Sequence, residues 1–181
     1  RKRLGFGPKL THDVHEHLRP QNAVTLSKLL EPYRLFFLED VLPPEQVQWF
    51  RLIREQCTTP QAMGELFVNP HEYVPLITER LIDYVRVRVS KGGGITPCRK
   101  IAALCEFFGV QTAWQEGGDN DPVNQAAAIH LDMASTISGE APCPSLHSLF
   151  TPHLTLLHTS SFTHHFRKFP FTFLFGLLTL M

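Results

Sequence analysis

Three acidic residues recur at intervals of 26 positions, each at the end of a short segment that predicts a buried strand: Asp13, Glu39 and Glu65. Residues 34–40 (RLFFLED) show the pattern most clearly. A continuous apolar run that ends in acids is typical of a parallel strand buried on both faces. A helical pattern follows each segment, and strand, loop and helix in regular succession predict an α/β fold.

The same unit extends along most of the chain. Strands are predicted at residues 9–14, 34–40, 61–65, 82–90 and 110–114, with residues 128–134 (AIHLDMA) as a candidate sixth strand. Helices are predicted at residues 22–33, 43–53, 71–81 and 96–108. In the last of these helices, Thr96 is the expected N-cap and Pro97 the expected first residue.

Two architectures fit this succession, the open doubly wound sheet and the closed (β/α)8 barrel. In a barrel the carboxyl ends of successive strands ring a common mouth, so adjacent units aim their acids at one point. In an open sheet the acids would be strung along an edge, and we therefore favour the barrel. A complete barrel needs about 250 residues. This chain has 181 and begins with Arg1, so we expect a partial barrel and interpret the sequence as a fragment.

Three converging carboxylates would repel one another unless a cation lies between them. A hard divalent ion accepts several such oxygens and keeps positions for water or substrate, so Asp13, Glu39 and Glu65 predict a Mg²⁺ site. The alternative is that each acid caps the next helix or faces solvent. Equal spacing on three consecutive units favours the metal site.

A histidine-rich segment surrounds the first acid. His15 follows Asp13 by two positions, so an extended segment would direct both toward the metal, where His15 could act as a general acid or base. A zinc site made of His12, His15 and His17 is the competing hypothesis. Alternation places His12 opposite His15, and the spacing lacks the H-E-x-x-H pattern of helical zinc sites.

Two further features could contact an anionic ligand. Residues 92–94 are a glycine run before a helix, which could hold an anion or simply form a tight turn. Arg86 and Arg88 share one face of a strand and could bind a substrate carboxylate or form buried ion pairs with neighbouring acids.

Charge and cysteine content narrow the class of protein. Seventeen basic and seventeen acidic residues cancel, so no long-range field favours nucleic acid or a membrane surface, and neither partner is expected. The four cysteines include no C-x-x-C pair, and no secretory signal opens the chain. We expect a cytoplasmic location.

The motifs together resemble a known family. The segments that carry the resemblance are THDVHEHLRP, PYRLFFLEDVLPPE, AMGELF, LIDYVRVRVSKGGGITPCRKIAALCEFFGVQTAW and DPVNQAAAIHLDMAS, spread from about residue 4 to residue 135. This ordered set is similar to the D-mannonate dehydratase group of the enolase superfamily, in the C-terminal barrel domain shared with mandelate racemase and muconate lactonizing enzyme.

The resemblance implies a (β/α)7β barrel that binds Mg²⁺ through Asp13, Glu39 and Glu65. It implies a lyase that dehydrates D-mannonate or D-gluconate to 2-keto-3-deoxygluconate in sugar-acid catabolism, and relatives that form homo-oligomers. His15 and Arg86 match catalytic positions of the family, with His15 as the acid for the departing hydroxyl. Asp119 matches an acid near the substrate.

The sequence also departs from the family pattern. Gln115 stands where relatives carry histidine, and it cannot shuttle a proton, although it can still bind substrate. The family's Tyr–Arg base, its capping domain and its first strands would precede Arg1. We expect residues 1–136 to form the barrel segment and residues 137–181, rich in Phe, His and Thr, to be poorly ordered. The alternative to an active dehydratase is a catalytically inactive remnant that keeps the metal ligands.

Overall fold

Five strands form one parallel sheet in the computed structural model, which describes residues 1–115 and 122–135. The strands are β1 (Thr11–Asp13), β2 (Phe37–Glu39), β3 (Gln61–Met63), β4 (Tyr84–Val85) and β5 (Gln111–Thr112). The helices are α1 (Pro20–Leu30), α2 (Phe50–Gln56), α3 (Pro70–Thr78), α4 (Ile95–Phe108) and α5 (Pro122–Ala134), with 3₁₀ turns η1 (Glu31–Tyr33) and η2 (Pro44–Trp49).

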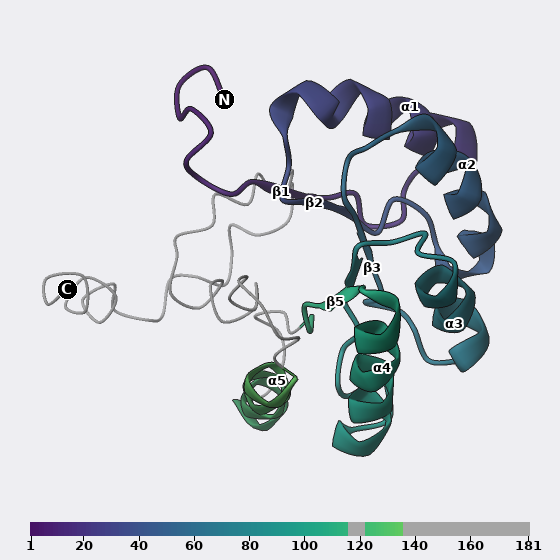
Figure 1. The fold of residues 1–181 in the computed structure, drawn as a ribbon, viewed down its shortest axis with the longest axis vertical. Coiled ribbons are helices and arrows are strands. Elements are labelled where there is room, and N and C mark those ends of the chain that lie inside the picture. The colour runs from purple at the N-terminus through teal and green to yellow at the C-terminus, as the bar shows by residue number, and fades with distance from the viewer. Residues whose placement is uncertain (116–121, 136–181) are drawn as a thin grey trace, which may run out of the picture.

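The order of the strands identifies the architecture. They lie in the sequence order β1-β2-β3-β4-β5, and each neighbouring pair is parallel. Right-handed crossovers in a sequential sheet place every connecting helix on the same face. Helices α1 to α4 accordingly lie in an arc outside the strands (Figure 1). A doubly wound sheet would reverse its strand order, so the prediction of a partial barrel is confirmed.

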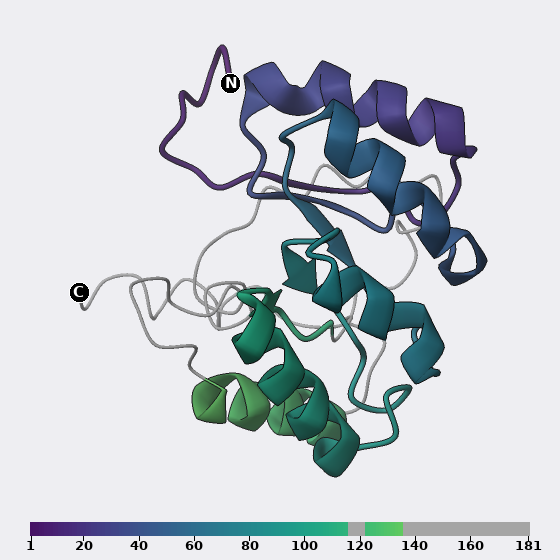
Figure 2. The same cartoon turned by 45° about the vertical axis from the view of Figure 1, so that its right-hand side comes forward.

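The outer face of the sheet carries the main hydrophobic core. Leu38 of β2 and Val85 of β4 are fully buried, and they belong to the same cluster as Phe50 and Ile53 of α2. Figure 2 shows these helices stacked against the outer side of the strands. Because side chains alternate along a strand, Glu39 shares with Phe37 the opposite, inner face. Burial of the outer face therefore directs Glu39 toward the inside of the barrel.

Two helix starts differ from the prediction, and the candidate sixth strand was wrong. Residues 128–134 belong to α5, where the buried Ala128 and Leu131 lie three positions apart on one helical face. A short apolar run does not distinguish strand from helix by its period. α4 begins at Ile95 after Gly94 as N-cap, two residues before the predicted start with Thr96 as N-cap and Pro97 as first residue. The helical segment after Pro43 starts as the 3₁₀ turn η2.

Other helix starts were closer to the prediction, but the strand predicted at residues 82–90 is shorter, since β4 covers Tyr84–Val85. α3 starts with a capping box in which the Asn69 side chain accepts from the His71 amide at 3.0 Å and Glu72 accepts from the Asn69 amide at 3.0 Å. α4 ends at Gly109, whose φ of 71° is the left-handed conformation that closes many helices. Within the described residues, no helix is long and apolar enough to cross a membrane.

We expect the Cys105 thiol to resist alkylation in the folded protein. Cys105 is fully buried in α4, and burial raises its pKa from 9.0 to about 12. This shift lowers the fraction of reactive thiolate by about a thousandfold. Iodoacetamide at pH 8, followed by peptide mass spectrometry, should modify Cys105 only after denaturant is added. Equal modification rates with and without denaturant would contradict the burial of α4.

Candidate active site

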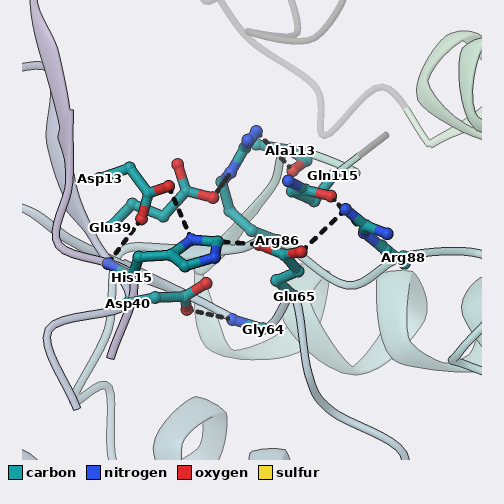
Figure 3. Close-up of polar contacts among 10 residues, drawn as sticks. All are labelled: Asp13, His15, Glu39, Asp40, Gly64, Glu65, Arg86, Arg88, Ala113 and Gln115. Atoms are coloured by element: carbon teal, nitrogen blue, oxygen red, sulfur yellow. Dashed lines mark hydrogen bonds and ion pairs between the residues drawn. The ribbon is translucent and has the colours of Figure 1, made fainter. Parts of the chain in front are cut away.

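The three predicted metal ligands lie at one end of neighbouring strands (Figure 3). Asp13 and Glu39 are the last residues of β1 and β2 and are direct partners in the ladder. Glu65 follows the end of β3 by two residues, after Gly64 with a φ of 145°. The 26-residue spacing therefore brings three carboxylates to the same strand ends.

His15 folds back onto Asp13. Its amide donates to Asp13 Oδ1 at 2.8 Å, and its Nδ1 lies 3.1 Å from Asp13 Oδ2 and 3.9 Å from Glu65 Oε2. The segment is not extended as predicted, because His15 has a φ of 57° and Glu16 a φ of 65°. Burial lowers the pKa of His15, but the carboxylates of Asp13, Glu65 and Glu16 together raise it above its ordinary value. One imidazole thus bridges two of the acids.

Glu39 forms an ion pair with Arg86, the residue directly after β4. Arg86 Nε donates to Glu39 Oε1 at 2.6 Å, and Arg86 Nη1 donates to the Ala113 carbonyl at 3.2 Å. The Glu39 side chain is only 7% exposed. Burial raises the pKa of Glu39, Arg86 opposes this, and the carboxylates of Asp13 and Glu65 add to the rise. Burial is the main cause of the raised pKa, and repulsion from the two neighbouring carboxylates is a smaller one.

Glu65 is held by a second arginine. Arg88 Nη2 lies 2.8 Å from Glu65 Oε1, and Arg88 Nε donates to Gln115 Oε1 at 2.8 Å. The structure therefore shows Arg86 and Arg88 in buried ion pairs, one of the two roles considered for them. It also connects Gln115 to an acid of the cluster. Asp119 lies outside the described residues.

The oxygen donors suit Mg²⁺, although Glu39 and Glu65 are paired with arginines in this structure. Among residues 1–115 and 122–135, no three His, Cys, Asp or Glu side chains are gathered closely enough to hold a metal. Arg86 contacts Oε1 of Glu39, and Arg88 contacts Oε1 of Glu65. The second oxygen of each glutamate, with Asp13, forms a set of hard donors of the type Mg²⁺ prefers. No triad of histidines supports the zinc hypothesis in this part of the chain.

Comparison with known families decides the ancestry of this arrangement. The sequence profile of the enolase C-terminal domain-like family matches residues 1–167. The chain belongs to this family. Membership agrees with the parallel sheet and with the acids at its strand ends.

Three enolase C-terminal domain-like proteins are similar to this chain. A D-galactonate dehydratase family member of Paenibacillus sp. (strain JDR-2) is 68% identical over 134 residues, which is 74% of this chain and 33% of the relative. D-mannonate dehydratase of Caulobacter vibrioides is 48% identical over 139 residues, which is 77% of this chain and 34% of that relative. The crystal structure of a Pantoea ananatis enolase with bound D-gluconate and Mg aligns with a TM-score of 0.75 and 48% identity, covering 82% of this chain and 37% of that one.

The chain spans about a third of the length of these curated relatives. Their names include both galactonate and mannonate dehydratases, so the comparisons support the enolase superfamily and a sugar-acid dehydratase ancestry without deciding the D-mannonate group predicted from the motifs.

The sequence reasoning missed Asp40, a further acid of this enolase C-terminal domain-like site. Asp40 is 1% exposed, and its Oδ1 accepts from the Gly64 amide at 3.0 Å. Burial and the adjacent Glu39 raise its pKa well above the ordinary value. Its φ of 42° adds a third strained residue beside His15 and Glu16, and such strain gathers at functional sites. A second acid directly after a buried apolar run was the available signal.

The glycine run forms a tight turn. An added Cβ on Gly92 would lie 2.9 Å from Cys98 Sγ and 2.9 Å from Val87 Cγ1. Gly93 and Gly94 have φ values of 90° and 97°, which side chains rarely adopt. The run thus turns the chain from β4 into α4, as one of its two interpretations predicted.

Two cavities lie away from the acids. One of about 430 Å³ separates α4 from α5 and is lined in part by Arg99, Glu106 and His130. Another, of about 370 Å³, lies at the opposite ends of the strands beside Arg54 and Arg80. Neither includes an acid of the cluster.

Proposed function

We propose that this chain forms the metal-binding part of a Mg²⁺-dependent sugar-acid dehydratase. The reaction converts a six-carbon sugar acid, such as D-mannonate or D-gluconate, into a 2-keto-3-deoxy acid and water. The observation that carries the proposal is the placement of Asp13, Glu39 and Glu65 at adjacent strand ends. The Mg and D-gluconate bound by the similar Pantoea ananatis protein support the same chemistry.

The difficulty of the reaction is the weak acidity of the proton next to the substrate carboxylate. Bound Mg²⁺ supplies positive charge that stabilises the negative charge developing as this proton leaves. His15, beside Asp13 and Glu65, would donate a proton to the departing 3-hydroxyl. Arg86, Gln115 and Asp119 would orient the substrate. The base that removes the proton is not assigned to a residue of this chain.

A turnover assay tests the proposal directly. The full chain is incubated with Mg²⁺ and a panel of D-mannonate, D-gluconate and D-galactonate, and the 2-keto-3-deoxy acid is measured. Product from any of these acids supports a dehydratase and ranks its substrates. Absence of product from all of them would refute catalysis by this chain.

Glu39→Gln should weaken Mg²⁺ binding by at least about tenfold, because the ion loses a charged ligand. The amide oxygen can still accept from Arg86, so the variant removes the charge with little change in shape. Isothermal calorimetry measures the affinity. Glu79→Gln is the matched control, since Glu79 is an exposed acid paired with Arg51. Equal Mg²⁺ affinity in wild type and Glu39→Gln would refute the metal site.

Gln115 favours a second candidate, a protein that binds Mg²⁺ without turnover. Its side chain accepts from Arg88 and cannot transfer a proton in place of the family histidine. Mg²⁺ binding without product from any hexonate would support this candidate. Product formed by Gln115→His but not by wild type would place the loss of activity at this residue.

A further inference from the structure

We infer that Asp40 is a positioning residue, which holds Gly64 so that the Glu65 carboxylate faces the other two acids. The inference deepens the proposed function and rests on it for the metal. It assigns a role to a buried acid that the catalytic scheme does not use.

Asp40 connects three neighbouring strand ends. Its backbone amide donates to the Ala62 carbonyl at 3.0 Å, and its carbonyl accepts from the Glu16 amide at 2.6 Å. Its side chain accepts from the Gly64 amide at 3.0 Å. The bonded residues Glu16 and Gly64 are the immediate neighbours of His15 and Glu65. One residue therefore links the segments that carry the acids and the histidine.

The Asp40 carboxylate restrains the backbone at Gly64, which connects β3 to Glu65. Its φ of 145° is open to glycine, and an added Cβ would lie 3.0 Å from the Arg86 carbonyl carbon and 3.0 Å from the Val87 amide nitrogen. The Gly64 carbonyl accepts from the Phe67 amide at 3.0 Å. With the amide bonded to Asp40, both polar groups of Gly64 are engaged. Because glycine has more backbone freedom than other residues, the side chain of Asp40 restrains the amide side of this peptide, and the Phe67 amide restrains its carbonyl side.

The restraint determines where Glu65 points. From this fixed peptide the Glu65 carboxylate reaches Arg88 at 2.8 Å and His15 at 3.9 Å (Figure 3). Loss of the Asp40 bond would let the segment after β3 swing away from Asp13 and Glu39. Hydrogen bonds that orient metal ligands contribute about 10- to 100-fold to metal affinity.

Two substitutions of Asp40 test the hydrogen bond to Gly64 without changing the backbone conformation. Asp40 has a φ of 42°, which glycine and asparagine both tolerate. Asp40→Gly removes the side chain without adding backbone strain, and Asp40→Asn keeps an oxygen that can accept from Gly64. Amide hydrogen exchange by NMR reports the restraint at Gly64 without metal, and calorimetry reports Mg²⁺ affinity. Asp132→Asn, a buried acid on α5, serves as the control for general loss of stability.

We expect the Gly64 amide to exchange at least about tenfold faster in Asp40→Gly, while the Leu38 amide, bonded to Pro60 in the core ladder, changes less. Mg²⁺ affinity should fall by about tenfold. Asp40→Asn should restore both to within about threefold of wild type, and Asp132→Asn should change neither selectively.

Unchanged Gly64 exchange in Asp40→Gly overturns the inference, and so does faster exchange with unaltered Mg²⁺ affinity. If wild type binds no Mg²⁺, the proposed function fails, and exchange at Gly64 and Glu65 alone decides the positioning role. If Asp40→Gly does not fold, the wild-type protein provides the test. Its Gly64 amide should then be as protected as the Arg86 amide bonded to Met63, and rapid exchange would overturn the inference.

Discussion

Arg86→Met should lose about 3–5 kcal/mol of unfolding free energy, because it leaves Glu39 as a buried charge without its partner. Arg86 and Glu39 are 18% and 7% exposed, and no other ion pair to Glu39 is found in the described residues. Methionine retains much of the volume of the arginine stem, so the loss reports charge more than packing. Urea denaturation followed by circular dichroism measures the effect.

Arg51→Met is the matched control. Arg51 and Glu79 also approach to 2.6 Å, but their side chains are 53% and 40% exposed. Water and salt screen such a pair, so its removal should leave stability nearly unchanged. Equal losses in Arg86→Met and Arg51→Met would show that burial does not set the strength of the Glu39 contact.

The stability of the wild type and of Arg86→Met in Mg²⁺ also tests whether Glu39 is a metal ligand. If Glu39 is a ligand, Mg²⁺ at a hundred times its dissociation constant should stabilise the wild type by about 2.7 kcal/mol. The ion should also restore part of the stability lost in Arg86→Met, because it replaces the missing positive charge beside Glu39. No rescue at saturating Mg²⁺ would argue against Glu39 as a ligand.

The sequence predicted the fold where local patterns agree with the final packing. Within the apolar run at residues 34–40, Phe37–Glu39 form the buried strand β2, because both faces of the sheet are covered there. Residues 128–134 have a similar composition, yet they form part of α5. α5 packs against α4, and a local sequence pattern does not contain this contact between separate segments of the chain.

The candidate site was predictable only in part. Acids at the ends of successive strands must come together in a barrel, so Asp13, Glu39 and Glu65 could be chosen from spacing. Their ion pairs with Arg86 and Arg88 were only one of two alternatives, because both arginines follow β4 and Arg86 is 47 residues from Glu39 in the chain. The left-handed turn at His15 was also not predicted, because positive φ is uncommon outside glycine even though histidine adopts it more often than most residues.

Gly64→Ala should lose about 3 kcal/mol of unfolding free energy or more, the second large effect expected in this protein. A side chain at a φ of 145° carries strain of about 1–3 kcal/mol. Its Cβ would also approach backbone atoms of Arg86 and Val87 at 3.0 Å, and a backbone cannot move aside as a flexible side chain can. Chemical denaturation measures the loss. Mg²⁺ affinity should fall in the folded fraction, because the shift displaces Glu65.

Gly109→Ala is a control that has the backbone strain of a positive φ without a steric clash at the added Cβ. Gly109 also has a left-handed φ, of 71°, but an added Cβ would meet nothing within 4 Å. Its cost should be limited to the left-handed conformation, about 1–2 kcal/mol, with Mg²⁺ affinity unchanged. The difference between the two variants measures how tightly the segment before Glu65 is packed against Arg86 and Val87, directly after β4. Equal losses, or a Gly64→Ala protein with wild-type Mg²⁺ affinity, would mean that Glu65 reaches the cluster without a rigid Gly64.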